Sequence, residues 1–340
     1  MPNSQTSLVK KKLRAWGIGS ITLLLLIIAV EQLIGWQAVI DQWRKLSLAN
    51  LLVCLFFFCL SYLTRARRIF LLCQPEVGSS FALVTKLSVL HTFTNNILPM
   101  RLGEATFPIL MKRYYGAGVI KSLARLFWLR VLDALIALGL AGIVFAIYFP
   151  MIALLGATLV LATSLIIWIT QRKNLSKLLS KQPSQSAQQP AASFIQKVIL
   201  KAQSTLQHIA QAAPSTHALR NRLIAYTLVS WLCKISALTW LVFCLSGLDL
   251  LAVAGAVIGA EMSVLSPVQG IAGAGSFEAA FMVGLSPSGH ANANALSLAV
   301  NLHVFVLAGS ALFAMAALAI KPNSMKPSNS IENIDEHPTK

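Results

Sequence analysis

A ten-residue stretch carries the side chains best suited to chemistry, and it directly follows the apolar run at 81–93. The stretch reads Asn95-Asn96-Ile97-Leu98-Pro99-Met100-Arg101-Leu102-Gly103-Glu104. The guanidinium of Arg101 matches the shape of a phosphate or carboxylate, which it can bind through two parallel hydrogen bonds. Charged side chains such as Arg101 and Glu104 are costly in lipid unless they are paired or hydrated. The stretch therefore predicts a polar cavity for an anionic group, and the alternative is an interfacial loop with a snorkelling arginine.

The backbone of this stretch is predicted to leave the helical conformation. Pro99 lacks a backbone donor and disfavours helix at Leu98, and Gly103 tolerates angles that other residues avoid. Backbone freed from a helix at membrane depth must be buried in protein or line a wet cavity. We therefore expect a broken helix at the cavity wall, within a re-entrant pair of helices over residues 81–111.

A second break of the same kind is predicted at residues 266–278, which are rich in proline and glycine. Its candidate cavity residues are Pro267, Gly270, Gly273, Gly275 and Glu278. The short helices after the two breaks should begin near Glu104 and Ser276, and helix N-termini attract anions such as phosphate. The glutamates at these positions either cap those helices or pair with Arg101 or Arg130.

Further ionisable residues fall inside apolar runs. Arg130 and Asp133 are three residues apart and share a helix face, which suits an ion pair or, for the arginine, a phosphate contact. Lys234 either snorkels to the membrane edge or faces the cavity. Glu261 is either a proton-linked carboxylate or a neutral acid hydrogen-bonded inside the bundle.

Motifs for metal binding and covalent catalysis are missing from the sequence. No set of His, Cys or carboxylate residues has metal-ligand spacing, and no P-loop, dinucleotide fingerprint or catalytic triad occurs. His91 and His303 are accordingly expected to be satisfied core histidines. The sequence predicts no metal, no cofactor and no catalytic residue, and hence a protein that is not an enzyme.

The composition places these residues in a membrane. The 340 residues are 56% hydrophobic and only 11% charged, with a mean hydropathy of +0.70, whereas soluble domains are about 25% charged. The net charge of +17 could suggest nucleic acid, but the basic residues lie in the gaps between apolar runs. That placement favours anionic inner-leaflet lipids as partners and argues against nucleic acid.

The apolar runs predict an all-α polytopic membrane protein with about six full spans and two re-entrant pairs. The spans are expected at 16–36, 48–63, 123–149, 151–170, 223–245 and 295–320, and the re-entrant pairs at 81–111 and 250–285. The first re-entrant pair should enter from the cytoplasm and the second from outside. This arrangement is typical of an inverted repeat with a site near the midplane.

The distribution of cations predicts the orientation. Of the 28 Lys and Arg residues, only Arg44 and Lys45 fall on the predicted outer side, while Arg101, Arg130 and Lys234 fall within the membrane. The remainder lies inside or at the inner edge, so both termini are expected in the cytoplasm. The predicted cytoplasmic parts are the basic N-terminus 1–14, a linker at 171–222 with an amphipathic helix, and the tail 321–340.

These residues resemble one family. Residues 95–104, Arg130 with Asp133, and the stretch from Pro267 through its glycines to Glu278 are similar to the flippase-like membrane domain of the lysylphosphatidylglycerol synthase family. The resemblance covers about residues 16–320 and suggests a transmembrane domain at 15–320. It implies movement of a lipid headgroup between leaflets. That lipid is aminoacylated phosphatidylglycerol in bifunctional relatives, whereas other relatives are linked to glycolipids or polyprenyl-linked sugars. We expect a stand-alone member, because no soluble aminoacyl-transferring domain follows the last span.

The leading hypothesis is translocation of a polar-headed, anionic or phosphate-containing lipid, either a phospholipid or a glycolipid, without a covalent step. The alternatives are an integral membrane enzyme or accessory subunit acting on lipid-linked sugars, with Glu104, Asp133 and Glu278 as acids or bases, and a small-solute exporter. A lipid-synthesising enzyme is a possible partner, and the bacterial inner membrane is the expected location.

Overall fold

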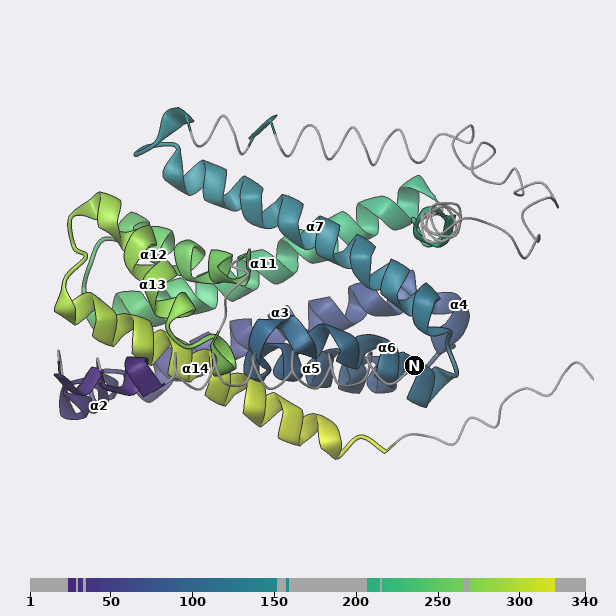
Figure 1. The fold of residues 1–340 in the computed structure, drawn as a ribbon, viewed down its shortest axis with the longest axis horizontal. Helices are drawn as coiled ribbons and strands as arrows, with labels where there is room; N and C mark the ends of the chain where they lie inside the picture. The colour runs from purple at the N-terminus through teal and green to yellow at the C-terminus, as the bar shows by residue number, and fades with distance from the viewer. Residues whose placement is uncertain are drawn as a thin grey trace, which may run out of the picture.

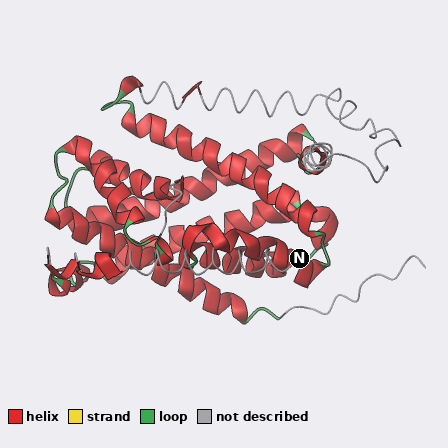
Figure 2. Cartoon of the chain, in the orientation of Figure 1, coloured by secondary structure: helices red, strands yellow, loops and turns green. Residues whose placement is uncertain are grey.

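The computed structural model describes residues 24–28, 30–32, 35–151, 157–158, 207–214, 216–265 and 270–321. Within these ranges the chain forms helices and connecting turns, and no strand occurs among them (Figure 1, Figure 2). The prediction of an all-α polytopic fold is therefore confirmed. The predicted span 151–170, the linker 171–222 and both predicted cytoplasmic termini lie wholly or largely outside the described residues.

Four apolar helices are long enough to cross a membrane, and a bent pair could form a fifth span. The four are α3 (Leu48–Leu72), α7 (Val119–Phe145), α11 (His217–Ser246) and α14 (Ala293–Leu318), which correspond to four of the predicted spans. The bent pair joins Leu24–Gln32 to α2 (Trp36–Trp43) at 84°, and Gly35 between them has a φ of 79°. The predicted first span, 16–36, therefore does not continue straight past Gly35.

Polar residues set where the long helices begin. The Ser47 hydroxyl accepts a hydrogen bond from the Asn50 amide at 3.2 Å, and the Thr216 hydroxyl accepts one from the Leu219 amide at 3.1 Å. Asn292 caps α14 in the same way. Each side chain accepts a hydrogen bond from one of the amides that the first helical turn leaves without a partner. Residues next to each helix start therefore determine where the helix begins.

Helix α3 extends to Leu72, beyond its predicted end at residue 63. The helix continues through Arg65, Arg67 and Arg68, because the apolar residues 69–72 extend its packed face. Arginine is also a good helix former. Two of the three arginines consequently point into the protein, as described below.

The first break is confirmed. Helix α5 (Phe81–Ile97) ends two residues before Pro99, and the intervening Leu98 is extended, with φ −76° and ψ 131°. A 3-10 turn, η1 (Pro99–Ala105), then leads into α6 (Thr106–Tyr115). Proline at the start of η1 explains both the extended residue before it and the end of α5.

Gly103 lets the turn η1 press directly against α5. A Cβ added at Gly103 would lie 2.4 Å from Asn95 Oδ1 and 2.5 Å from the Asn95 backbone nitrogen. We expect Gly103→Ala to force η1 and α5 apart and to lower the free energy of unfolding by about 1–3 kcal/mol, as overpacking typically does. Thermal unfolding in detergent measures the effect. In the matched variant Gly139→Ala the new methyl group meets nothing within 4 Å, so an equal loss in both variants would contradict this prediction.

The second break separates two helices that fold back on each other. Helix α12 (Leu250–Met262) runs into the turn η3 (Ser263–Leu265), and the turn η4 (Ile271–Gly273) precedes α13 (Ser276–Leu285). Pro267 lies outside the described residues, so its predicted place at the cavity is not described.

Glycines bring α12 and α13 into backbone contact. A Cβ on Gly259 would lie 2.5 Å from the Ala280 carbonyl oxygen, and one on Gly284 would lie 2.4 Å from the Gly255 oxygen. Because the lower-numbered glycine of α12 meets the higher-numbered residue of α13, the helices run antiparallel. Only glycine permits so close an approach.

The two folded-back pairs lie toward opposite ends of the bundle, with α12 and α13 at one end and α6, beside α4 (Gln74–Val77), at the other (Figure 1). The main core packs α3, α11, α12, α13 and α14 together, around Phe58, Leu241, Val257, Phe281 and Leu302. A second core at the α4 end contains Leu87, Phe107, Met111 and Leu126. Helix α7 contacts α6, α11 and α12, and so bridges the two ends. The cytoplasmic orientation of the termini and the inverted-repeat relation of the two pairs stay predictions.

Candidate functional site

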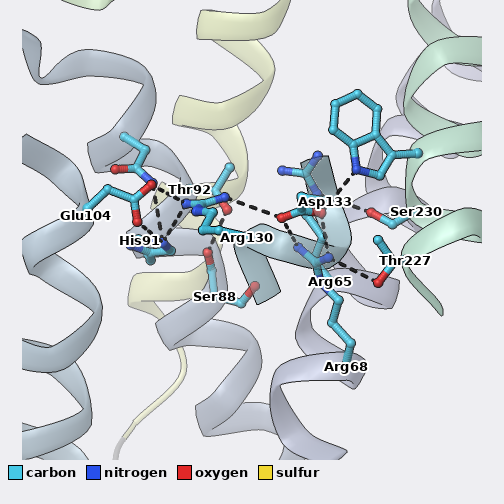
Figure 3. A network of polar contacts seen from close by, with 12 residues as sticks. Arg65, Arg68, Ser88, His91, Thr92, Glu104, Arg130, Asp133, Thr227 and Ser230 are labelled. Carbon is cyan, nitrogen blue, oxygen red and sulfur yellow. Dashed lines mark hydrogen bonds and ion pairs between the residues drawn. The ribbon is translucent and has the colours of Figure 1, made fainter. Parts of the chain in front are cut away.

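A cavity of about 420 Å³ lies where α3, α5, η1, α7, α11 and the end of α12 meet. Its ionisable lining residues are Arg65, Arg68, His91, Arg101, Glu104, Arg130, Asp133, Lys234 and Glu261. Figure 3 shows the centre of this network, in which Arg130 lies between Glu104 and His91 on one side and Asp133 on the other. Residues from six separate elements thus converge on one polar site.

Asp133 is the anchor of the network. Arg68 holds it with two parallel hydrogen bonds, from Nη1 to Oδ1 at 2.6 Å and from Nη2 to Oδ2 at 2.8 Å. The indole N–H of Trp231 donates to Oδ1 at 3.1 Å, and Arg130 Nη1 lies 3.5 Å from Oδ2. The predicted contact between Arg130 and Asp133 is therefore present, but the shorter bonds to Asp133 come from Arg68. Bidentate bonds to a buried carboxylate fix the geometry of both side chains.

Arg130 bridges the Asp133 anchor to the first break. Its Nη2 lies 2.8 Å from Glu104 Oε1 and 3.2 Å from His91 Nε2. The amide nitrogen of Asn95 also approaches His91 Nε2, at 3.3 Å. Since both neighbours can only donate to this ring nitrogen, Nε2 accepts and the proton of a neutral His91 resides on Nδ1. The expectation that Glu104 pairs with Arg130 is confirmed.

Lys234 and Glu261 form a second buried ion pair in the cavity wall. Their side chains are 14% and 5% exposed, so the ammonium group faces the cavity and its counter-charge rather than bulk solvent. Of the two alternatives for Lys234, the structure supports the cavity role. Glu261, in turn, faces a cation instead of a neutral hydrogen-bonding group.

The charges in the cavity do not balance. Five cations face three carboxylates, which leaves an excess of two positive charges when His91 is neutral. In the part of the chain that the structure describes, Arg65 and Arg101 form no ion pair. Arg65 Nε donates only to the Ser230 hydroxyl, at 3.2 Å, and Arg101 is exposed. The excess therefore resides on two arginines that are available to an anion.

The backbone of Arg101 is in the left-handed region, with φ 58°. This conformation is uncommon for a residue with a Cβ and costs on the order of 1–3 kcal/mol. Such outliers cluster at functional sites, where the surrounding structure holds them in place. Here the close packing of Gly103 on Asn95 fixes the turn in which Arg101 lies.

Apolar side chains form a further part of the cavity wall, beside the polar residues Ser88, Thr92, Asn95 and Asn96. Its apolar residues come mainly from α7, and they are Ile69, Leu126, Leu129, Ala134, Ala137, Leu138, Met262 and Val264. The cavity lining thus combines an excess of cations with apolar side chains. That combination suits a ligand which is anionic at one end and apolar at the other.

The predicted site residues fall into three groups. Asn95, Asn96, Arg101, Glu104, Arg130 and Asp133 line the cavity. Pro99 and Gly103 are buried and shape the turn that carries Arg101. The described residues of the second break do not line the cavity, and they are Gly270, Gly273, Gly275 and Glu278.

Among the described residues, those of the first break line this cavity and those of the second do not; that both breaks line one cavity stays a prediction, since residues 266–269 lie outside the described residues. The two breaks do contact each other, because η4 packs on η1 and α5. Glu278 does not pair with Arg101: its Oε2 accepts from the Gly275 amide at 2.8 Å, and its Oε1 lies 2.6 Å from His303 Nδ1. The expected capping role of Glu278 is confirmed.

The sequence analysis missed Arg65 and Arg68 as cavity residues. They are three residues apart and share a face of α3 with Ile69, so helical spacing in an apolar run that continues to Leu72 was the available signal. Trp231 had no such signal, because its hydrogen bond to Asp133 joins helices 98 residues apart in the chain.

Comparison with known proteins gives one family. Residues 15–314 match the model of the lysylphosphatidylglycerol synthase TM region, which covers the cavity and nearly all described helices. No curated protein matches the chain.

Proposed function

Because this chain belongs to the lysylphosphatidylglycerol synthase family through its transmembrane region, we propose that it moves lipids with a phosphate-bearing headgroup between the leaflets of the membrane. The headgroup enters the cavity between α3, α5 and α7, while the acyl chains stay in the bilayer. No covalent step is involved.

The observation that carries this proposal is the pair of arginines without carboxylate partners. Arg65 and Arg101 line the same cavity and supply its positive excess. A guanidinium binds phosphate oxygens in a bidentate manner and stays charged at any physiological pH, so it suits this headgroup better than an ammonium does. The neighbouring ion pairs hold the remaining charges in place, which leaves these two side chains to respond to a ligand.

The apolar wall from α7 supports an amphipathic ligand over a free anion. Leu126, Leu129 and Leu138 line the same cavity as the cations, and the first carbons of an acyl chain or glycerol backbone can pack on them. The two folded-back helix pairs approach this region from opposite ends of the bundle (Figure 1). Movement of one pair at a time would open the cavity to one leaflet at a time.

The environment of the carboxylates supports transport over catalysis. Glu104, Asp133 and Glu261 each face a cation at ion-pair distance. A carboxylate in such a pair has its oxygens engaged by the cation, whereas a general acid or base must lie within hydrogen-bond reach of the substrate. An enzyme acting on lipid-linked sugars therefore stands as the alternative outcome of the test below.

Reconstitution into vesicles tests the proposal. Fluorescent phosphatidylglycerol placed in one leaflet is expected to reach the other faster with the protein than without it, as followed by a membrane-impermeant quencher. Phosphatidylcholine, whose headgroup has no net charge, should move more slowly. Glycerol phosphate, which has the headgroup chemistry but no acyl chain, should not be taken up.

Two results would contradict lipid translocation. Uptake of glycerol phosphate at the rate of the lipid would indicate a small-solute exporter. A chemically altered lipid, detected by mass spectrometry of the vesicles, would indicate an enzyme.

A further inference from the structure

Glu278 and His303 form a buried pair that the lipid cavity does not use. Their side chains are 3% and 9% exposed, and His303 Nδ1 lies 2.6 Å from Glu278 Oε1. The other ring nitrogen, Nε2, lies 2.7 Å from the carbonyl oxygen of Ala272 in the second break. The ring of Phe277 stacks on the imidazole, with centroids 4.4 Å apart. The histidine is therefore held on both edges and on one face.

The contacts of His303 fix the number of protons at this site. A carbonyl oxygen can only accept, so Nε2 must carry a hydrogen that it donates to Ala272. The 2.6 Å contact between Nδ1 and Oε1 needs a second hydrogen, because two lone pairs would repel at this distance. That hydrogen belongs either to an imidazolium beside a carboxylate or to a carboxylic acid beside an imidazole. In both cases the pair binds one proton more than a neutral histidine and an ionised glutamate would.

The same pair holds the backbone of the second break. Glu278 Oε2 accepts from the Gly275 amide at 2.8 Å, and His303 holds the Ala272 carbonyl. Ala272 has φ 57°, Gly273 has φ 78° and Gly275 has φ 83°, so this segment stays in an unusual conformation that its partners must stabilise. Loss of the proton would leave a carboxylate facing the Nδ1 lone pair in a dry environment, and the contact would open.

Among the described residues, Glu278 and His303 form ion pairs only with each other. In this part of the chain no other charged side chain forms an ion pair or a hydrogen bond with Glu278 or His303, whose remaining hydrogen bonds go to the backbone of Gly275 and Ala272. The titratable or charged groups on the elements that contact α13, α14 or η4 are Asp41, Cys54, Cys59, Tyr62, Arg65, Arg67, Arg68, Lys86, His91, Arg101, Glu104, His217, Arg220, Arg222, Tyr226, Cys233, Lys234, Cys244 and Glu261. Two of these groups have partners elsewhere: Lys86 donates to the carbonyls of Leu318 and Ile320, and Glu261 pairs with Lys234.

We propose that Glu278 and His303 are a proton-binding site whose occupancy locks the second break, residues 270–278. The turn η4 within this segment packs on η1, which carries Arg101 into the cavity, so release of the proton loosens the support of the lipid site. Proton binding and locking stand on this geometry alone. Their effect on lipid movement rests on the proposed function.

Hydrogen–deuterium exchange of the full-length protein in nanodiscs, measured in a series of buffers from mildly acidic to mildly alkaline, tests the lock. Rates are corrected for the intrinsic pH dependence of amide exchange. In the wild-type protein, protection of residues 270–280 should fall about tenfold or more as the pH rises, since a charge-assisted hydrogen bond is lost.

Two variants represent the fully protected and the unprotected limits of the exchange measurement. Glu278→Gln can donate its amide hydrogen to Nδ1 and still accept from Gly275, so it should stay protected at every pH. His303→Phe keeps the stack on Phe277 but loses both hydrogen bonds, so it should be unprotected at every pH. His290→Gln removes an exposed histidine outside this network and should titrate like the wild type.

A flat, pH-independent protection in the wild type, equal to that of Glu278→Gln, would overturn the proposal and leave a purely structural pair. If Glu278→Gln does not assemble, infrared difference spectra between acidic and alkaline pH answer the same question. A pair that releases a proton must gain or lose a carboxyl or imidazolium signal in the wild-type protein, and this signal should be altered in His303→Phe. The vesicle assay separates this inference from the proposed function. Protection that changes with pH in a protein that moves no lipid supports the proton site and rejects translocation. Lipid movement by a protein whose protection does not change with pH supports translocation and rejects the proton site.

Discussion

Replacing Arg101 with alanine is expected to lower the initial rate of phosphatidylglycerol translocation by about 10- to 100-fold, the equivalent of one charge-assisted hydrogen-bonding contact. The fold should stay assembled, because Arg101 is exposed and forms no ion pair with any described residue. Arg101→Lys keeps the charge but not the bidentate fork, so it should recover only part of the rate. The quencher assay in vesicles gives the rates, and size-exclusion chromatography reports on assembly.

Two variants distinguish loss of the binding group from general effects of charge or backbone. Arg67→Ala removes one cation from α3, but Arg67 packs over Phe70 and Phe81 outside the cavity, so translocation should persist. Arg101→Gly removes the same guanidinium and also the backbone strain at this position, because glycine adopts the left-handed conformation readily. Its free energy of unfolding should therefore be at least that of the wild type, while lipid translocation should still be lost. Normal translocation in Arg101→Ala would contradict the role of this side chain.

Replacing Asp133 with alanine is expected to lower the free energy of unfolding by about 3–5 kcal/mol, because the buried guanidinium of Arg68 loses its carboxylate partner. Arg68 is 5% exposed and donates two hydrogen bonds to this carboxylate, and Trp231 donates a third. Once the acceptor is removed, Arg68 keeps only its 3.3 Å bond to the Thr227 hydroxyl and its charge stays buried without a carboxylate. Chemical or thermal unfolding in detergent measures the loss.

A surface ion pair supplies the control for Asp133. Asp41 lies 2.7 Å from Arg44, much as Asp133 lies 2.6 Å from Arg68, but these side chains are 45% and 73% exposed. Asp41→Ala should therefore cost at most about 1 kcal/mol. Combining Arg68→Met with Asp133→Ala should restore part of the lost stability, since the stranded charge is gone. Coinciding unfolding curves for Asp133→Ala and Asp41→Ala would show that burial does not matter here.

The parts of the site that local chemistry determines could be predicted from the sequence. Pro99 ends α5 and Gly103 permits the tight turn, so the first break and the position of Arg101 within it were accessible. The i, i+3 spacing of Arg130 and Asp133 likewise placed them on one helix face. These features depend on neighbours within a few residues, where conformational rules are strongest.

The parts that depend on distant partners could not be predicted. Arg68 looks like a helix-end cation until Asp133, 65 residues later, supplies the carboxylate that makes its burial tolerable. Glu278 looks like a partner for Arg101, but His303 on α14 lies closer once α13 and α14 pack together. Which of several carboxylates meets which cation is decided by helix packing, and that information is spread over the whole chain.

The Lys234–Glu261 pair has a consequence for how the chain is made. Lys234 lies in the interior of α11, and its counter-charge is synthesised 27 residues later, on α12. A lysine or arginine at the centre of an inserting helix costs about 2.5–3.5 kcal/mol, and less toward the helix ends. Helix α11 thus leaves the ribosome with a charge that no earlier acid neutralises, and α3 leaves with Arg68 in the same condition. Each helix must stay at the insertion machinery, or keep its arginine or lysine hydrated, until the helix with the partner carboxylate has been synthesised. The order of synthesis therefore constrains the order in which these helices can enter the membrane.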